Sequence, residues 1–139
     1  MGGKGIFLRC MLVLLLVCGL AGCETVNEGG EKGKEWDYTV VPTADVPADF
    51  LKEIDTKKIN AFQMSYEEGE YLYIAVGYGE QNSGGFNIQV VGLYEKGEQL
   101  CIETSLTGPG EDEVVSDKAS YPYIVIKTQK TDKDVVFET

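Results

Sequence analysis

Carboxylates are the side chains of this sequence whose type and spacing could do chemistry. Four of them lie in the segment GPGEDEVVSD, residues 108–117: Glu111, Asp112, Glu113 and Asp117. Several carboxylate oxygens in one loop could hold Ca²⁺, a hard cation that prefers oxygen ligands. The D-x-D-x-D-G spacing of a dedicated calcium loop is absent, however. We therefore interpret this segment as a solvated acidic loop and predict no metal site.

Groups for other kinds of catalysis are scarce. The chain has no histidine, which excludes Ser-His and Cys-His pairs, and Arg9 is its only arginine. Paired carboxylates could still act as general acid and base, but the acidic residues here fall in predicted turns, where exposure to solvent is usual. Cys101 lies in the strand-like run QLCIETSL and is expected to be a core residue, because a reactive thiol needs positive surroundings. We predict a protein without catalytic activity and without a cofactor.

The first residues have the pattern of a targeting segment. Lys4 and Arg9 make the start of the chain basic, residues 6 to 20 are otherwise almost all apolar, and LAGC at 20–23 ends at Cys23. A run of this length suits a signal peptide and is short for a membrane-spanning helix. The LAGC ending resembles a bacterial lipobox, which implies that residues 1–22 are removed and that Cys23 carries lipid on the extracytoplasmic face of the cell membrane. An ordinary signal peptide or an N-terminal anchor helix remains the alternative.

Charge and composition divide the rest of the chain into a short tether and one domain. Loss of residues 1–22 would remove Lys4 and Arg9 but no acidic residue, so the net charge of −11 would become −13. Such a surface repels nucleic acid, whose binding depends on basic residues. Residues 23–35 are Gly-rich and charged, and we predict a flexible tether there. Residues 36–139 have the length of one domain.

Hydrophobic periodicity in that domain predicts mainly strands. One short helix is expected near residues 47–58, where Phe50, Leu51 and Ile54 form a narrow apolar face. Two alternating runs within residues 59–80 meet at a Gly-bearing acidic turn, which predicts a hairpin. Turns then recur every ten to fifteen residues or so. The predicted fold is mainly β, an antiparallel sandwich or open barrel of about six to eight strands.

The segment GYGEQNSGGF is longer than a tight hairpin requires. Its two glycines permit backbone angles closed to other residues, so a sharp turn or bulge before the next strand explains them. The alternative is a partner-binding loop with an exposed tip, flanked by the aromatic residues Tyr78 and Phe86. The candidate binding residues are Asn82, Ser83, Gly84, Gly85 and Phe86.

A second motif, Tyr121-Pro122-Tyr123, opens a hydrophobic strand. Proline cannot donate to a sheet ladder, so Pro122 is expected to begin a strand at a sheet edge. The two tyrosines are expected to be core or half-buried residues, with a docking surface as the alternative.

Taken together, these motifs resemble the PrcB family of protease complex subunits. The likeness covers residues 62–128 and rests on Ser-Gly-Gly-Phe at 83–86, Gly-Pro at 108–109 and Tyr-Pro-Tyr at 121–123. Phe86 stands where tyrosine is common in the family. The resemblance implies a lipoprotein accessory subunit that assembles with, and stabilises, a subtilisin-like surface protease.

The predicted function is therefore a non-catalytic, membrane-anchored, protein-binding subunit, with a surface protease or another envelope protein as its partner. Two alternatives stay open. One is a protease inhibitor that inserts a loop into an active-site cleft, and the other is an envelope protein that binds a small ligand or calcium.

Overall fold

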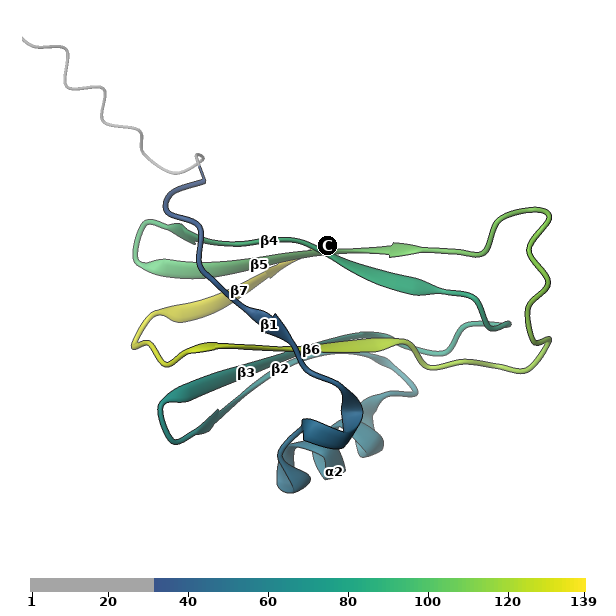
Figure 1. The fold of residues 1–139 in the computed structure, drawn as a ribbon, viewed down its shortest axis with the longest axis horizontal. Helices are drawn as coiled ribbons and strands as arrows, with labels where there is room; N and C mark the ends of the chain where they lie inside the picture. Colours follow the sequence, from purple (N-terminus) through teal and green to yellow (C-terminus); the bar gives the residue numbers. More distant parts are fainter. Residues whose placement is uncertain (1–31) are drawn as a thin grey trace, which may run out of the picture.

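The computed structural model describes residues 32–139 and shows two packed β-sheets with one helix on the outer side of the lower sheet (Figure 1). The predicted signal peptide, Cys23 and the tether up to residue 31 lie outside the described residues. The elements are β1 (Thr39–Val40), the 3₁₀ helix η1 (Thr43–Asp45), α2 (Ala48–Lys57), β2 (Ala61–Glu68), β3 (Tyr71–Tyr78), β4 (Asn87–Lys96), β5 (Gln99–Thr107), β6 (Tyr123–Gln129) and β7 (Asp134–Glu138).

The lower sheet has four antiparallel strands in the order β1-β6-β3-β2. The predicted hairpin is confirmed as β2 and β3, which pair without interruption from Ala61↔Tyr78 to Glu68↔Tyr71. Gly69 occupies the turn with φ +60°, a left-handed conformation that favours glycine. The alternating pattern therefore fixed both the hairpin and its register.

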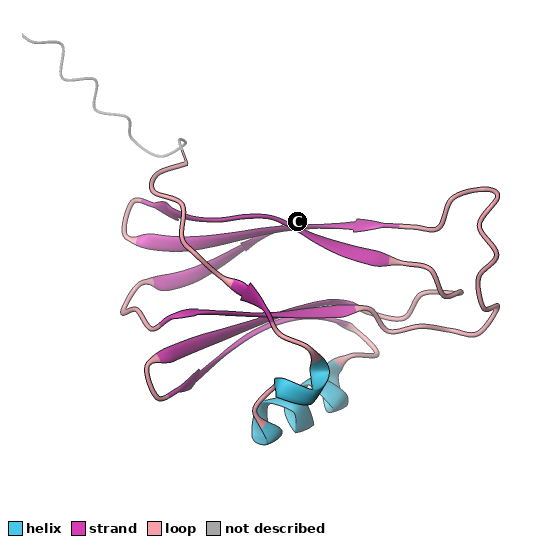
Figure 2. Cartoon of the chain, viewed as in Figure 1, coloured by secondary structure: helices cyan, strands magenta, loops and turns pink. Residues whose placement is uncertain are grey.

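The upper sheet has three strands in the order β4-β5-β7. β4 and β5 are antiparallel, with a bulge between Val90 and Gly92, whereas β5 and β7 run parallel. The parallel pair arises because the chain crosses from β6 in the lower sheet to β7 in the upper one (Figure 2). The predicted sandwich is confirmed, and the described strands do not close into a barrel.

The core has two layers, because β3 and β6 bury both of their faces. Between the sheets lies an aliphatic cluster of Leu72, Ile74, Val76, Leu93, Leu100, Ile102 and Ile126. Between the lower sheet and α2 lies a second cluster of Val46, Phe50, Ile54, Phe62, Tyr73, Ala75 and Val125. Burial of this apolar surface on both sides makes the lower sheet the central layer of the domain.

The helix confirms its predicted apolar face. Phe50 and Ile54 are fully buried against the sheet, and the ring of Phe50 stacks on Tyr66 with centroids 5.2 Å apart. Pro47 is the residue that precedes the helix, and Lys57 in the last turn has the charge that the helix dipole favours there. In the part of the chain that the structure describes, no helix is long and apolar enough to cross a bilayer.

The N-terminal segment 32–41 connects the two sheets at their side. Gly33 N donates to Glu95 O at 2.7 Å and Trp36 N donates to Leu93 O at 2.8 Å, so this segment covers part of the edge of β4. It then pairs with β6 through the two residues of β1. Gly33 is required at this contact, since a Cβ atom there would lie 2.8 Å from Glu95 O. Residues 33–35, which the composition assigned to the tether, are held by the domain.

Candidate functional site

Two loops that lie far apart in the sequence join at one end of the sandwich. Loop 79–86 connects β3 to β4, and loop 108–122 connects β5 to β6. Gln81 and Ser120 exchange backbone hydrogen bonds of 2.8 and 3.0 Å, and Gly84 N donates to Ser116 O at 2.8 Å. We call this pair of loops the loop end. Backbone pairing gives it a defined shape.

Ser83 is held within the loop end rather than exposed at its tip. Its carbonyl oxygen accepts a 2.6 Å hydrogen bond from Ser120 Oγ, and its own hydroxyl donates to Gly84 O at 3.1 Å. The residue is half-buried, whereas Asn82 beside it is exposed. The expectation that both side chains project from the tip is thus correct for Asn82 alone, because loop 108–122 packs over Ser83.

Gly85 has a conformational and a steric reason to be glycine. Its φ is +84°, in the left-handed region, as the predicted turn before the strand requires. A Cβ atom there would clash with the Val115 side chain and would lie 3.0 Å from Pro109 Cβ. Gly84 differs, because its Cβ would meet Ser116 at an ordinary 3.5 Å. Gly85 is thus a position where the two loops leave no room for a side chain.

The aromatic residues that flank the first loop pack inward. The ring of Phe86 lies against Gly108, where an added Cβ would be 3.2 Å from the ring. The hydroxyl of Tyr78 makes a 2.8 Å hydrogen bond with Thr104 Oγ1 in the sandwich interior. Both rings therefore anchor the ends of the loop that they flank.

The Tyr-Pro-Tyr motif begins β6, as predicted, but β6 is not an edge strand. It lies between β1 and β3, because the N-terminal segment adds β1 to its outer side. Tyr78 N donates to Pro122 O at 3.1 Å, and Tyr78 O accepts from the Gln81 side-chain amide at 3.2 Å. The amide of Gln81 thus replaces the backbone donor that proline lacks.

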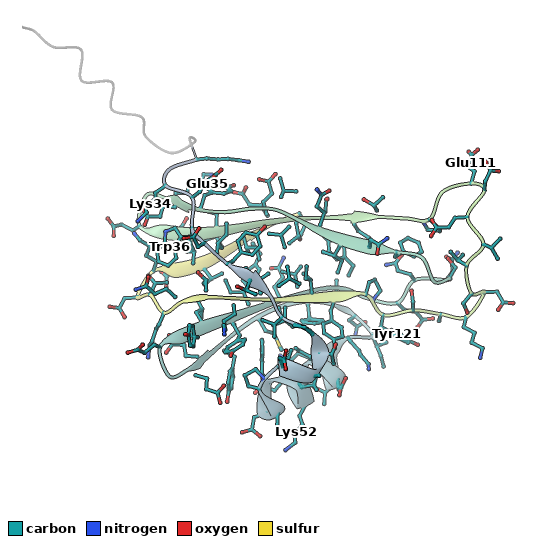
Figure 3. All side chains as sticks on the ribbon, in the orientation of Figure 1. Lys34, Glu35, Trp36, Lys52, Glu111 and Tyr121 are labelled. Carbon is teal, nitrogen blue, oxygen red and sulfur yellow. The ribbon has the colours of Figure 1, made fainter. Side chains whose placement is uncertain are left out.

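The two tyrosines of this motif have different environments. The ring of Tyr123 is half-buried and packs at 6.4 Å from the ring of Phe62, as expected for a core residue. Tyr121 is 36% exposed and lies on the loop-end side of the molecule (Figure 3). Of the two, Tyr121 alone could contact a partner.

The outermost part of the loop end is acidic with one apolar side chain. Glu111, Asp112, Glu113 and Asp117 are exposed, and Val114 among them is 98% exposed. Glu113 Oε2 accepts a 3.1 Å hydrogen bond from Gly110 N, which closes a local turn. Within residues 32–139, no group of three or more acidic or cysteine side chains is placed to hold a metal ion.

A polar cluster on the outer face of the upper sheet was not predicted. Tyr94 donates to Glu138 Oε2 at 2.8 Å, and Lys96 Nζ lies 3.1 Å from Glu138 Oε1. The bond from Tyr94 is the main cause that lowers the pKa of Glu138, while burial raises the pKa of the adjacent Cys101 thiol. Cys101 is fully buried, in keeping with the core role expected for it.

A groove of about 820 Å³ lies at the opposite end, between the N-terminal segment, the β2–β3 turn and the β6–β7 connection. Two of the lysines that line it contact neighbouring side chains. Lys130 Nζ lies 3.1 Å from the Glu67 carboxylate, and Lys127 Nζ lies 4.3 Å from the centre of the Tyr71 ring. None of the sequence-predicted site residues lines this groove.

Fold and loops together define a small β-sandwich module that presents two joined loops at one end. Comparison with known proteins places it more closely. Residues 72–129 match the family model described as PrcB C-terminal, which confirms the family resemblance for this part of the chain. The match runs from β3 to the last residue of β6 and includes both loops. No curated protein and no solved structure matches the chain.

Proposed function

We propose that this chain is a non-catalytic accessory subunit, attached to the extracytoplasmic face of the cell membrane by lipid on Cys23, that binds a partner protein through its loop end. The PrcB C-terminal domain suggests association with a protease complex. A surface protease is accordingly the partner class that we propose, and the binding event would stabilise that enzyme.

The observation that carries this proposal is that the N-terminal segment and the loop end lie at opposite ends of the domain. The N-terminal segment, with Lys34 and Glu35, enters at one end of the sandwich, while Glu111 lies at the other (Figure 3). A lipid on Cys23 would hold the first end near the membrane. The loop end would then face away from the bilayer, toward soluble domains of neighbouring proteins.

The construction of the loop end also supports binding. All three motif segments of the family resemblance converge there: Gly85 packs on Pro109, and Ser83 is bonded to Ser120 just before Tyr121. A pre-shaped loop loses little conformational entropy when a partner binds, so its contacts contribute more of their energy to affinity.

A crosslinking pull-down of the full-length protein from its native membrane tests the proposal. Recovery of a surface protease in a constant ratio is the expected result. Glu111→Lys, which reverses a charge at the loop end, should reduce that recovery, as should Asn82→Arg. Glu53→Lys makes the same charge change on the exposed side of α2 and should have no effect. Equal recovery of the protease with all three variants would show that the loop end is not the binding site.

One observation favours a second function. Val114 projects almost wholly into solvent from a loop whose base is fixed by backbone hydrogen bonds, which is an arrangement that could enter a protease cleft. An inhibitor would slow the recovered protease at stoichiometric amounts. An accessory subunit would instead raise the yield or lengthen the half-life of that protease, so the same purified pair separates the two functions.

A further inference from the structure

The edge strands of the two sheets differ in how well they are protected from pairing with a strand of another molecule. β1 is only two residues long, and β7 has five residues. The edge of β4 carries a bulge and is partly covered by residues 33–36. Short strands, bulges and covering segments are the usual means by which proteins prevent edge-to-edge association.

β2 has none of these protections. It is eight residues long, contains no proline, glycine or lysine, and pairs with β3 without a register shift. Nothing else in the described part of the chain pairs with its outer side. An edge of this length and regularity is a ready template for another strand.

The hydrogen-bond pattern of β3 shows which groups of β2 face outward. At one end Lys130 N donates to Glu70 O, and at the other end Tyr78 N donates to Pro122 O. Even-numbered residues of β3 thus direct their backbone groups toward β6. Because these directions alternate along a strand, its odd-numbered residues bond to β2. They are paired with Phe62, Met64, Tyr66 and Glu68.

The remaining residues of β2 therefore offer their N–H and C=O groups to the outside. These residues are Ala61, Gln63, Ser65 and Glu67, and all four are exposed. They are distributed evenly about Met64. An antiparallel copy of β2 centred on Met64 would pair Gln63 with Ser65 and Ala61 with Glu67, each pair exchanging two hydrogen bonds.

Charge favours a second copy of the same strand as the occupant. Lys57 precedes β2, while Glu68 and Glu70 follow the middle of the strand, and all three are exposed. Antiparallel self-pairing brings the acidic end of each copy beside the basic end of the other. A two-fold interface of this kind is self-complementary, which is the property that closed dimers require.

We propose that two copies of this chain associate through their β2 edges, centred on Met64, into one continuous eight-stranded lower sheet, twice the four strands of each copy. The α2 helices of both copies then lie on the same face of that sheet. The loop ends stay outside the interface, so the dimer could offer two of them to partners.

Disulfide trapping in the full-length chain tests the pairing in its native membrane. In this arrangement Met64 faces its own copy in a non-hydrogen-bonded pair, with Cα atoms about 4.5 Å apart, which a disulfide can span. Ala61 lies about 20 Å from its own copy, beyond that reach. Met64→Cys should give a reducible dimer, whereas Ala61→Cys and the unmodified chain, with its native cysteines, should not.

A second substitution checks that backbone pairing forms the contact. Ser65→Pro removes an outward-facing donor while leaving the β2–β3 ladder intact, so it should abolish the Met64→Cys dimer without abolishing the cooperative thermal unfolding of the chain. Self-pairing is overturned by any of three results from a folded protein. These are no dimer with Met64→Cys, equal dimer with Ala61→Cys, or a Met64→Cys product that contains a different protein.

Discussion

The carbonyl oxygen of Ser83 accepts a 2.6 Å hydrogen bond from the hydroxyl of Ser120, 37 residues further along the chain. This bond joins the segment that begins the Gly-Gly-Phe motif to the segment that leads into Tyr-Pro-Tyr. It explains how two loops, each too polar to form a core, hold a common shape at one end of the sandwich.

Removal of that bond should loosen the loop end without unfolding the domain. Ser120→Ala leaves the half-buried Ser83 carbonyl with one partner fewer, at a cost of about 1 kcal/mol. Hydrogen exchange at the Gly84 amide, which is bonded to Ser116, should become faster. Ser105→Ala, on β5 and outside both loops, serves as the control. Unchanged protection at Gly84 would show that the backbone bonds suffice.

Gly85→Val should destabilise the whole domain. A β-branched residue is strained at φ +84°, and its side chain would overlap Val115. We expect a loss of about 1–3 kcal/mol in the free energy of unfolding, measured by urea denaturation. Gly84→Ala is the matched control, because its Cβ has room, and it should change stability far less. Equal effects from both substitutions would contradict the special position of Gly85.

The hydrogen bond from Tyr94 to Glu138 should make stability depend on pH in the acidic range. A carboxylate whose pKa is lowered in the folded state stabilises the fold above its unfolded pKa, about 4.3. That contribution is lost as the pH falls through the lower folded value. Tyr94→Phe should therefore give a flatter profile of unfolding free energy against acidic pH. Parallel profiles for the two proteins would argue against this linkage.

The same bond has the opposite consequence in alkali. It is the main cause that raises the pKa of Tyr94 in the folded protein. The resulting stabilisation is complete below the unfolded pKa of tyrosine, about 10, and is lost as the pH rises toward the folded value. A spectroscopic titration should show a tyrosine that ionises above the ordinary pKa of about 10, and that transition should be missing from Tyr94→Phe.

Membrane attachment should depend on Cys23. Cys23→Ser removes the thiol that would carry lipid, and an acyl chain is the main source of membrane affinity for such a protein, at about 0.8 kcal/mol for each buried CH₂ group. We expect the variant to leave the membrane fraction, as followed by fractionation and immunoblotting. Retention that still requires detergent would favour an N-terminal anchor helix instead.

Much of the fold could be predicted because it depends on local patterns. Alternation from Phe62 to Val76, with Gly69 at the turn, determines the β2–β3 hairpin and its register, since a shift by one residue would expose the buried side chains. The apolar face of α2 is set by Phe50 and Ile54 in the same way. The paired glycines before β4 were predicted to allow unusual backbone angles, and Gly85 has such an angle, with φ +84°.

Only the tertiary structure decided which residues of those motifs remain accessible. Ser83, Phe86 and Tyr78 have the residue types of a binding loop. The second loop packs on Ser83 and Phe86, and Thr104 of β5 anchors Tyr78, so Asn82 is the one that stays exposed. Pro122 precedes an inner strand, β6, because a segment some eighty residues earlier adds to the side of that strand. Contacts at such separations leave no periodic signal in the sequence. The open edge of β2 and the bond from Tyr94 to Glu138 depend on strand order, and that order becomes fixed only when both sheets close on their common core.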